Sequence, residues 1–411
     1  MSLGAEYRKI WAGNAASNLA DGITFVAVPL LATTVTRSPL AIAALDVAYT
    51  LPRILAVLGI GVLIDRADRR QLLHLSNFAQ AAVFAILCLL QLAGAVSMPV
   101  LYVIFASIGL IETLADSSAF AVLPQAVAAA GLDKANSQIA ATQIILDEFV
   151  GPPIGGLLFA IAAFLPMGFN VLAFGVAGLS YFSLQGCYVI QSDETRPVRP
   201  INADIKEGVT WLRRNQILLT LTVIGALASI GYMIPFSYLV LYANRVLGLN
   251  AAGYGLLLSA SALGGLLGSW VARRLRSRIG YGRSIAAALT LGAVSFAVVS
   301  ATTNTIVVAV ALAGYMCHAV VWNVLASSVR QKIVPPEFMG RVGSVSKLLG
   351  LAGLATGAFA GGWLADAFGL RLPFAAAAVL FAGAALLCVL RIGQFRIWEE
   401  RQRIDALAPD E

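Results

Sequence analysis

The chain has 411 residues, of which 59% are hydrophobic and only 12% are charged, and its formal net charge is +7. Soluble globular domains carry roughly 25% charged residues, so this composition excludes an ordinary soluble enzyme or binding module. The segments 75–111, 149–192 and 284–329 contain no Asp, Glu, Lys or Arg. In lipid such apolar runs form helices. In the strands of a membrane barrel, apolar and polar residues would alternate, and these runs show no such alternation. We therefore predict an all-α integral membrane protein.

Polar and turn-forming residues divide the chain into predicted membrane-spanning helices of roughly 20 residues or more. There are twelve, at about 10–36, 40–64, 72–95, 99–121, 138–163, 167–190, 216–243, 251–272, 282–302, 306–329, 342–365 and 372–392. The longest connection, 191–215, follows the sixth span, and its segment 204–214 is typical of a short amphipathic helix on the membrane surface. We predict an N-terminal six-helix bundle at 1–190, this linker at 191–215, a C-terminal six-helix bundle at 216–393 and a tail at 394–411.

The basic residues predict the orientation in the membrane. With the N-terminus inside, only Arg37, Arg245 and Arg371 of the 28 Lys and Arg lie outside, while Arg53 and Lys347 fall within spans. Basic residues concentrate on the cytoplasmic side, so both termini are expected in the cytoplasm of a bacterial inner-membrane, multi-pass protein without a cleavable signal peptide. This bias and anionic lipid headgroups account for the net charge, so we expect membrane lipids and no nucleic acid as partners.

The two predicted halves resemble each other. Gly151-Pro-Pro-Ile-Gly155-Gly156-Leu-Leu in span five is similar to Gly357-Ala-Phe-Ala-Gly361-Gly362-Trp-Leu in span eleven, 206 positions later. Gly61 at the end of span two corresponds in the same way to Gly268, 207 positions later. Two matches at nearly one offset indicate a duplicated six-helix unit, an architecture that recurs in transporters. The two bundles are therefore expected to be pseudo-symmetric.

A charged hairpin between spans two and three carries a family resemblance. Its sequence resembles the loop signature of the major facilitator superfamily, roughly G-x-x-x-D-R-x-G-R-[RK]. The matching residues are Gly61, Asp65, Arg66, Arg69 and Arg70, while Asp68 occupies the usual glycine position. The run Gly151-Pro152-x-x-Gly155-Gly156 resembles the helix-five motif of proton-coupled exporters in that superfamily. The opening pattern from Asp21-Gly22 to Leu51-Pro52 resembles the branch that exports tetracycline-type drugs, macrolides and siderophores.

The hairpin is also interpretable from its chemistry. An ionised Asp65 at the inner surface can accept hydrogen bonds from the free N–H groups at the start of span eleven, near 340–344, where the helix end is partially positive. Such a contact would act as a latch in the outward-facing state. The alternative is that the acid and the arginines only cap the hairpin and anchor it to the membrane surface.

Ionisable residues inside a bilayer are costly and are therefore candidates for function. Arg53 and Glu112 should lie at similar depth, so we expect a buried pair between Arg53 and either Glu112 or Asp21; the alternative is a purely structural ion pair. Burial and neighbouring charges decide whether a carboxyl group holds a proton, and a moving arginine can switch it. The proton-coupling candidates are Asp21, Glu112 and Asp147, together with Arg53. The placement of Asp46, Asp116 and Glu148 depends more on the exact span boundaries, and a position in water stays open for them.

Substrate contacts are expected to be mostly apolar and aromatic. The candidate lining residues are Phe25, Phe149, Tyr232, Phe236, His318, Trp322 and Asn323, although each aromatic ring could instead serve packing or face lipid. The four cysteines are spread singly over separate spans, so neither a disulfide framework nor a metal site is expected.

These features predict a secondary active transporter. We expect it to export small amphipathic compounds, such as tetracyclines, macrolides or siderophore-like metabolites, by proton antiport and alternating access, as a monomer without a cofactor and with the proton gradient as its energy source. An uptake carrier or uniporter for a small metabolite or lipid would share the fold and stays open as the alternative. An integral membrane enzyme is disfavoured, because Asp65 and Asp68 have no second acidic cluster or soluble domain beside them.

Overall fold

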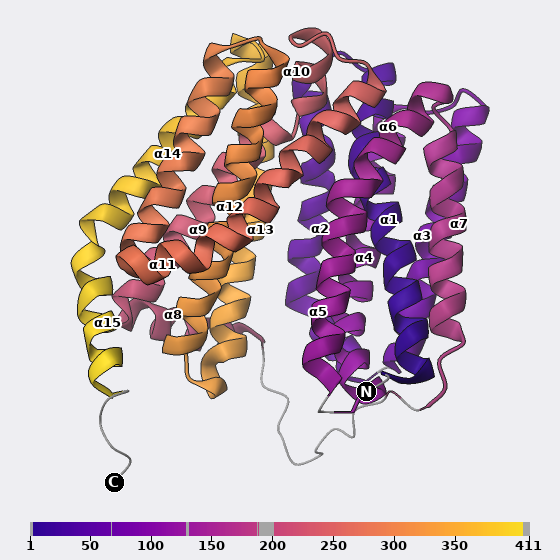
Figure 1. Ribbon diagram of the computed structural model, residues 1–411. Coiled ribbons are helices and arrows are strands. Elements are labelled where there is room, and N and C mark those ends of the chain that lie inside the picture. Colours follow the sequence, from indigo (N-terminus) through magenta and orange to yellow (C-terminus); the bar gives the residue numbers. More distant parts are fainter. Residues whose placement is uncertain (1–2, 67, 129–130, 187, 189–200, 406–411) are drawn as a thin grey trace. The chain divides into compact units, whose positions relative to one another are not determined.

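The structure is a computed structural model that describes residues 3–66, 68–128, 131–186, 188 and 201–405. For residues 57–66, 120–121, 201–204, 336 and 403–405 it describes the backbone but not the side chains. Within these ranges every regular element is a helix (Figure 1). The predicted all-α fold class is therefore confirmed.

Eleven helical segments of the described residues are long and apolar enough to cross a membrane. One of them, α11 (Ala251–Ala301), contains two predicted spans, because Gly280 within it has φ 80° and ψ 176°. That left-handed backbone is favourable only for glycine and interrupts the helix. A straight helix of this length would extend about 76 Å, more than twice the ~30 Å hydrocarbon core, so the break is required for two crossings. With the parts of α11 before and after Gly280 counted separately, the described residues contain the predicted twelve spans.

The chain divides into two compact units, each described here by itself. Unit 1 comprises Met1–Val198 and Tyr238–Ser259, and unit 2 comprises Arg199–Ser237 and Ala260–Glu411. The helices of unit 1 are α1 (Gly4–Val35), α2 (Pro39–Arg66), α3 (Arg69–Leu92), α4 (Met98–Ala126), α5 (Leu132–Gln143), the π-helix η2 (Ile144–Val150), α6 (Gly151–Ile161), α7 (Leu165–Phe182), α10 (Leu239–Arg245) and the start of α11. The helices α5, η2 and α6 together form the predicted fifth span.

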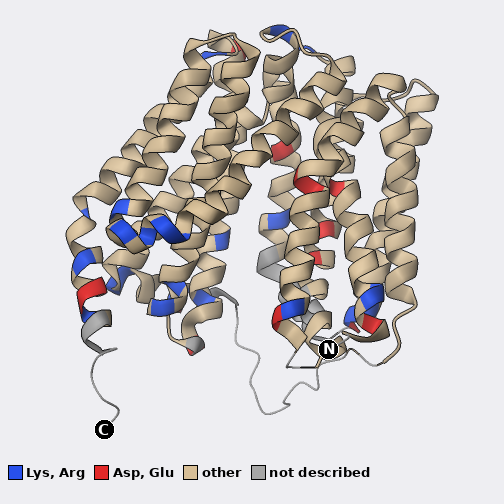
Figure 2. Cartoon of the chain, viewed as in Figure 1, with Lys and Arg blue, Asp and Glu red and all other residues tan. Residues whose placement is uncertain are grey.

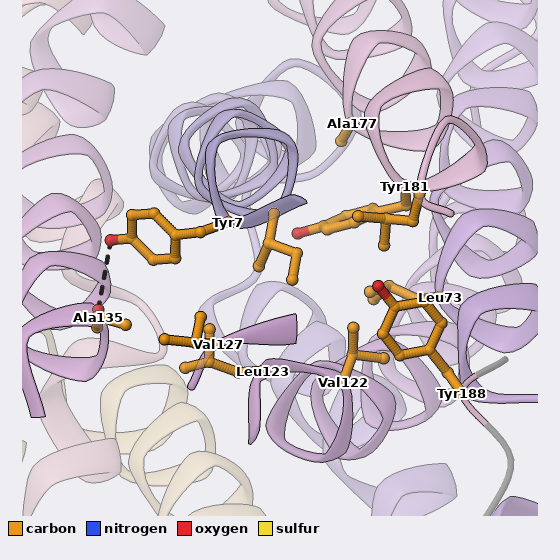
Figure 3. Packing of buried hydrophobic residues seen from close by; sticks show 11 residues of the cluster. Tyr7, Leu73, Val122, Leu123, Val127, Ala135, Ala177, Tyr181 and Tyr188 are labelled. Carbon is orange, nitrogen blue, oxygen red and sulfur yellow. Dashed lines mark hydrogen bonds between the residues drawn. The ribbon is translucent and has the colours of Figure 1, made fainter. Parts of the chain in front are cut away.

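The helix α1 is central to unit 1, where it packs against α5, η2, α6 and α7. Around it, α2 packs on α4, and α3 packs on both α4 and α7. A cluster of buried side chains lies at the end of the unit where α1 begins (Figure 3). It includes Tyr7 and Ile10 from α1, Leu73 from α3, Val122 from α4 and Tyr181 from α7. Burial of these apolar groups fixes the helix ends relative to one another.

Unit 2 contains the remaining elements. They are α8 (Ile201–Arg214), α9 (Gln216–Phe236), the rest of α11, α12 (Thr305–Ile333), α13 (Pro336–Phe368), α14 (Leu372–Leu390) and α15 (Ile392–Asp405). The helix α9 packs against α13 and α14, and α8 packs on α13. Arg341 of α13 forms a 2.9 Å ion pair with Glu207, and Trp211 stacks on Phe338 at a centroid distance of 5.7 Å. The predicted amphipathic helix is thus present and is held against α13.

Two features differ from the predicted division of the chain. The contacts group Tyr238–Ser259, predicted in the C-terminal bundle, with unit 1. The predicted tail at 394–411 begins inside a helix, because α15 runs from Ile392 to Asp405. Glu399 of α15 accepts a hydrogen bond from the backbone N–H of Tyr281, directly after the break at Gly280. The tail therefore caps the helix that follows the break, which a sequence pattern does not reveal.

The repeated glycine motif has the same packing role in each unit. The space at a glycine is measured by the Cβ atom that any other residue would add there. Such a Cβ at Gly155 would lie 2.8 Å from the carbonyl oxygen of Ile23 in α1. A Cβ at Gly361 would lie 1.9 Å from the carbonyl oxygen of Ile234 in α9. Both motifs therefore bring a helix into backbone contact with the first spanning helix of its own half, as small residues do in membranes.

Candidate functional site

A charged network connects α2 and α4 in unit 1. Nη1 of Arg53 lies 3.7 Å from Oε1 of Glu112, and Nη2 of Arg53 lies 3.9 Å from Oδ2 of Asp116. The hydroxyl of Tyr49 donates to Oε2 of Glu112 and accepts a hydrogen bond from Nη1 of Arg53. The guanidinium also lies over the Tyr49 ring, 4.7 Å from its centroid. The structure thus contains the predicted pair of Arg53 with Glu112.

A close helix crossing creates this geometry. A Cβ at Gly109 of α4 would lie 2.2 Å from the carbonyl oxygen of Tyr49 in α2. The backbones therefore meet at Tyr49 and Gly109. From that point Arg53 lies one turn further along α2, and Glu112 lies about one turn further along α4. Glycine at 109 lets the charged side chains approach, because any larger residue would separate the two helices.

The network is largely sheltered but not sealed. The side chains of Arg53 and Glu112 are 19% and 23% exposed, while that of Asp116 is 56% exposed. An ion pair removed this far from water loses much of its hydration, and each charge then depends on its partners. Asp116 gives the network an accessible end. The network therefore has two sheltered members and one accessible carboxylate.

Two further carboxylates belong to the same electrostatic group. Asp21 of α1 interacts electrostatically with Glu112, Asp147, Asp116 and Arg53. Figure 2 shows acidic residues within the helices of unit 1, away from the helix ends. The structure therefore assembles the predicted set of Asp21, Glu112, Asp147 and Arg53 in one unit, although their role in proton coupling stays a prediction.

The crossing of α1 with the fifth span positions Asp147 near α1. A Cβ at Gly22 would lie 2.4 Å from the carbonyl oxygen of Asp147, and a Cβ at Gly151 would lie 2.6 Å from Cα of Gly22. Asp147 lies in η2, and π-helical turns of this kind are frequent at functional sites. The neighbouring glycines thus bring the backbone of Asp147 against α1.

The helix-five motif continues the packing towards α11. A Cβ at Gly156 would lie 2.5 Å from the carbonyl oxygen of Ala251. The carbonyl oxygen of Pro152, in the first turn of α6, would lie 2.4 Å from a Cβ at Gly255. The hydroxyl of Ser259 donates to the backbone oxygen of Phe149 at 3.0 Å. All these residues belong to unit 1, so the motif serves to join α6 closely to α1 and to the start of α11.

The candidate substrate-lining residues fall in both units. In unit 1 Phe25 is 46% exposed and Phe149 is half-buried. In unit 2 Tyr232 and Phe236 pack together with a ring-centroid distance of 4.5 Å, and Asn323 is exposed. His318 and Trp322 are only 1% and 9% exposed, because His318 is enclosed by Tyr315 and Phe381. In this conformation these last two side chains therefore serve packing rather than lining.

The predicted latch residues have separate environments. Gly61, Asp65 and Arg66 lie in the stretch of α2 whose side chains are outside those described. Arg69 is buried, and Arg70 donates to the carbonyl oxygen of Phe182 at 2.5 Å. Asp68 caps α3 by accepting the backbone N–H of Arg70 at 2.9 Å. Asp68 thus caps the start of α3, whereas both interpretations of Asp65, as latch or as hairpin cap, stay predictions.

Tyr49 and Asp116 complete the network, and neither was among the predicted site residues. Their signal in the sequence is spacing, because residues four apart share a helix face. Tyr49 precedes Arg53 by four positions, and Asp116 follows Glu112 by four. The sequence leaves a position in water open for Asp116, and the side chain is indeed 56% exposed, but its contact with Arg53 depends on the packing of α4 on α2.

A two-unit, all-helical fold with charges held inside its spans defines a multi-pass membrane transporter. The family model described as transmembrane secretion effector matches residues 4–407. The chain therefore belongs to this family of the major facilitator superfamily, whose members are transporters and not enzymes.

Individual proteins agree with this assignment. The multidrug efflux pump Tap of Mycolicibacterium fortuitum is 30% identical over 370 residues, which cover 87% of this chain and 88% of that protein. Among solved structures, an inward-facing bacterial homologue of the iron transporter ferroportin has a TM-score of 0.76 at 18% identity, with 95% of this chain and 99% of the other covered. A variant of the nucleoside transporter NupG has a TM-score of 0.78 at 11% identity, with 95% and 100% covered. At these identities the two structures show the fold alone.

Proposed function

We propose that this transporter exports small amphipathic compounds by exchanging them for protons. The observation that carries the proposal is the network of Arg53, Tyr49, Glu112 and Asp116 inside the membrane portion of unit 1. Asp21 and Asp147 lie in its electrostatic range. A carboxylate binds or releases a proton according to the charges around it, so such a group suits a carrier that must do both in turn.

The direction and the substrate class rest on similarity as well as on chemistry. The similarity to a multidrug efflux pump supports export of drugs. Tetracyclines, macrolides and siderophore-like metabolites are proposed as substrates because the opening pattern from Asp21-Gly22 to Leu51-Pro52 resembles the branch that exports them. Phe25 in unit 1, which is exposed, and the paired rings of Tyr232 and Phe236 in unit 2 are the proposed sources of apolar contacts with such compounds. Alternating access would couple export to the proton gradient of a bacterial inner membrane, with both chain termini in the cytoplasm.

Efflux from proteoliposomes tests the proposal. Purified protein is reconstituted with a panel of dyes, tetracyclines and macrolides enclosed, and a pH gradient is imposed in either direction. We expect movement of at least one compound that requires the gradient and stops with a protonophore. Gradient-independent equilibration would indicate a uniporter, and accumulation in the opposite sense would indicate an uptake carrier.

A further inference from the structure

The beginnings of α1 and α5 enclose a cleft that the transport network does not use. Its volume is about 410 Å³, and its walls are formed by Leu3, Gly4, Ala5, Tyr7, Arg8, Lys134 and Gln138. Sites for small molecules have volumes of about 300–1,000 Å³, so the cleft is large enough for a compact polar headgroup. All of these residues belong to unit 1.

The cleft is basic. Arg8 and Lys134 contribute its cationic groups, and both side chains are exposed. Within the described residues, no hydrogen bond or ion pair occupies either group. Glu6, the nearby acid of α1, is already bound by Lys9 at 2.8 Å and by the backbone N–H of Gln185, and it is not part of the lining. The cleft therefore has positive charge available for an anion.

The helix starts add to this positive potential. The cap residues Leu3 of α1 and Gly131 of α5 make no side-chain hydrogen bond to the first helical turns. The first N–H groups of a helix have no partner within it, and that end has partial positive charge. Two such ends beside Arg8 and Lys134 favour an oxyanion with several acceptor oxygens, as a phosphate group has.

The cleft is preformed by a rigid seam between α1 and α5. The hydroxyl of Tyr7 donates to Oε1 of Gln138 at 2.8 Å, and Nε1 of Trp11 donates to Oγ1 of Thr142 at 2.9 Å. The two bonds are spaced one turn apart on both helices. Tyr7 is only 5% exposed, and its hydroxyl points towards Ala135 of α5 (Figure 3). Its burial holds the walls in place without help from a ligand.

Trp11 indicates which source of phosphate the cleft fits. Its ring is 42% exposed, one turn above the cleft on the same seam. Exposed tryptophans of membrane proteins lie at the level of the headgroups, where the ring meets both the acyl chains and water. Basic clefts between membrane helices at this level suit phospholipid headgroups. From these observations we propose that the cleft between α1 and α5 binds the phosphate of an anionic phospholipid through Arg8 and Lys134.

Lipid titration of the full-length protein tests this site. The protein is purified in detergent, and binding of phosphatidylglycerol is followed by native mass spectrometry, with phosphatidylcholine of the same acyl chains in parallel. We expect one phosphatidylglycerol to bind more tightly than any phosphatidylcholine. Replacement of both cations, Arg8→Gln with Lys134→Gln, should weaken that first binding step about 30-fold, as expected for two contacts of this kind.

Two further variants separate charge from structure. Arg273→Gln with Arg278→Gln removes the same charge from exposed positions of unit 2 and should leave the first step within about twofold of wild type. Arg8→Lys with Lys134→Arg keeps both charges and should retain binding even if the neutral variant is unstable. Equal losses in both neutral variants, or loss of binding in the charge-retaining variant, would overturn the proposal.

Soluble anions distinguish a lipid site from a site for free phosphate. Inorganic phosphate and glycerol 3-phosphate are added at concentrations far above that of the lipid. We expect them not to displace bound phosphatidylglycerol, because they lack the acyl chains that Trp11 would contact. Displacement by either anion, or equal binding of phosphatidylcholine, would show that the cleft does not select an anionic lipid.

Discussion

The guanidinium of Arg53 and the carboxylate of Glu112 lie 3.7 Å apart, with the hydroxyl of Tyr49 hydrogen-bonded to both. Tyr49 and Arg53 share one face of α2, and Glu112 comes from α4, so the network depends on the contact of these two helices. Any change of that contact alters the charges that surround Glu112. This relationship is the basis of the first two predictions.

Glu112→Gln should abolish efflux that is driven by a pH gradient and preserve exchange down a concentration gradient. The amide keeps the shape of the side chain but cannot exchange a proton. Both modes are measured in the same proteoliposomes, and Asp21→Asn is expected to act alike. Asp133→Asn, an equivalent change at an exposed position of α5, is the control and should transport as wild type does. Wild-type gradient-driven efflux from both site variants would remove these carboxylates from the mechanism.

Tyr49→Phe should leave Arg53 and Glu112 in place but remove the group between them. The variant loses two hydrogen bonds, one to Glu112 and one from Arg53. We therefore expect the free energy of unfolding to fall by roughly 1–3 kcal/mol. The pH dependence of efflux should also change, because the environment of Glu112 changes. Thermal melting and a pH series of efflux rates measure the two effects. An unchanged pH profile would show that the hydroxyl is only structural.

Gly155→Ala should destabilise the protein, because its Cβ would lie 2.8 Å from the backbone oxygen of Ile23. Separating α6 from α1 to relieve such overpacking costs about 1–3 kcal/mol. Gly175→Ala is the matched control, since no atom lies within 4 Å of a Cβ there. That change should be neutral or stabilise α7 by up to about 1 kcal/mol, because alanine favours helix. Equal midpoints of thermal unfolding for the two variants would contradict the packing role of the motif.

Glu399→Ala should remove the cap that α15 provides to the helix beginning at Tyr281. Loss of a helix cap costs about 1 kcal/mol, which thermal melting detects as a lower midpoint. Glu400→Ala removes an acid from the next position, where the partner is Arg396 in an exposed pair of the same helix. Exposed pairs contribute little, so the control should melt near wild type. A larger loss in the control would refute the capping role.

Asp65→Asn should reduce transport while the amount of folded protein at the membrane stays the same. The prediction follows from the proposed latch, in which a charged acceptor holds the start of α13 in one conformational state. Asp68→Asn is the control, because asparagine is as good a helix cap as aspartate and α3 should keep its start. Transport rates normalised to membrane protein decide the question. Equal rates in wild type and the Asp65 variant would exclude the latch.

The sequence by itself determined the helical membrane fold, the twelve spans, the amphipathic linker helix and the family. Each follows from local properties: apolar runs must form helices in lipid, and glycines and charges mark their ends. It also placed Arg53 and Glu112 at equal depth, because counting residues along two helices measures distance from the membrane surface.

Only the tertiary structure decided which side chains meet. Tyr49 enters the network because α2 and α4 touch at Gly109. His318 is enclosed because the rings of Tyr315 in α12 and Phe381 in α14 pack against it. The cap from Glu399 and the cleft at Arg8 and Lys134 join residues more than 100 positions apart. Helix periodicity defines which face a residue occupies, but helix packing defines what that face contacts. That packing depends on the close approach of backbones at a few glycines, and the sequence does not show which helix each of them meets.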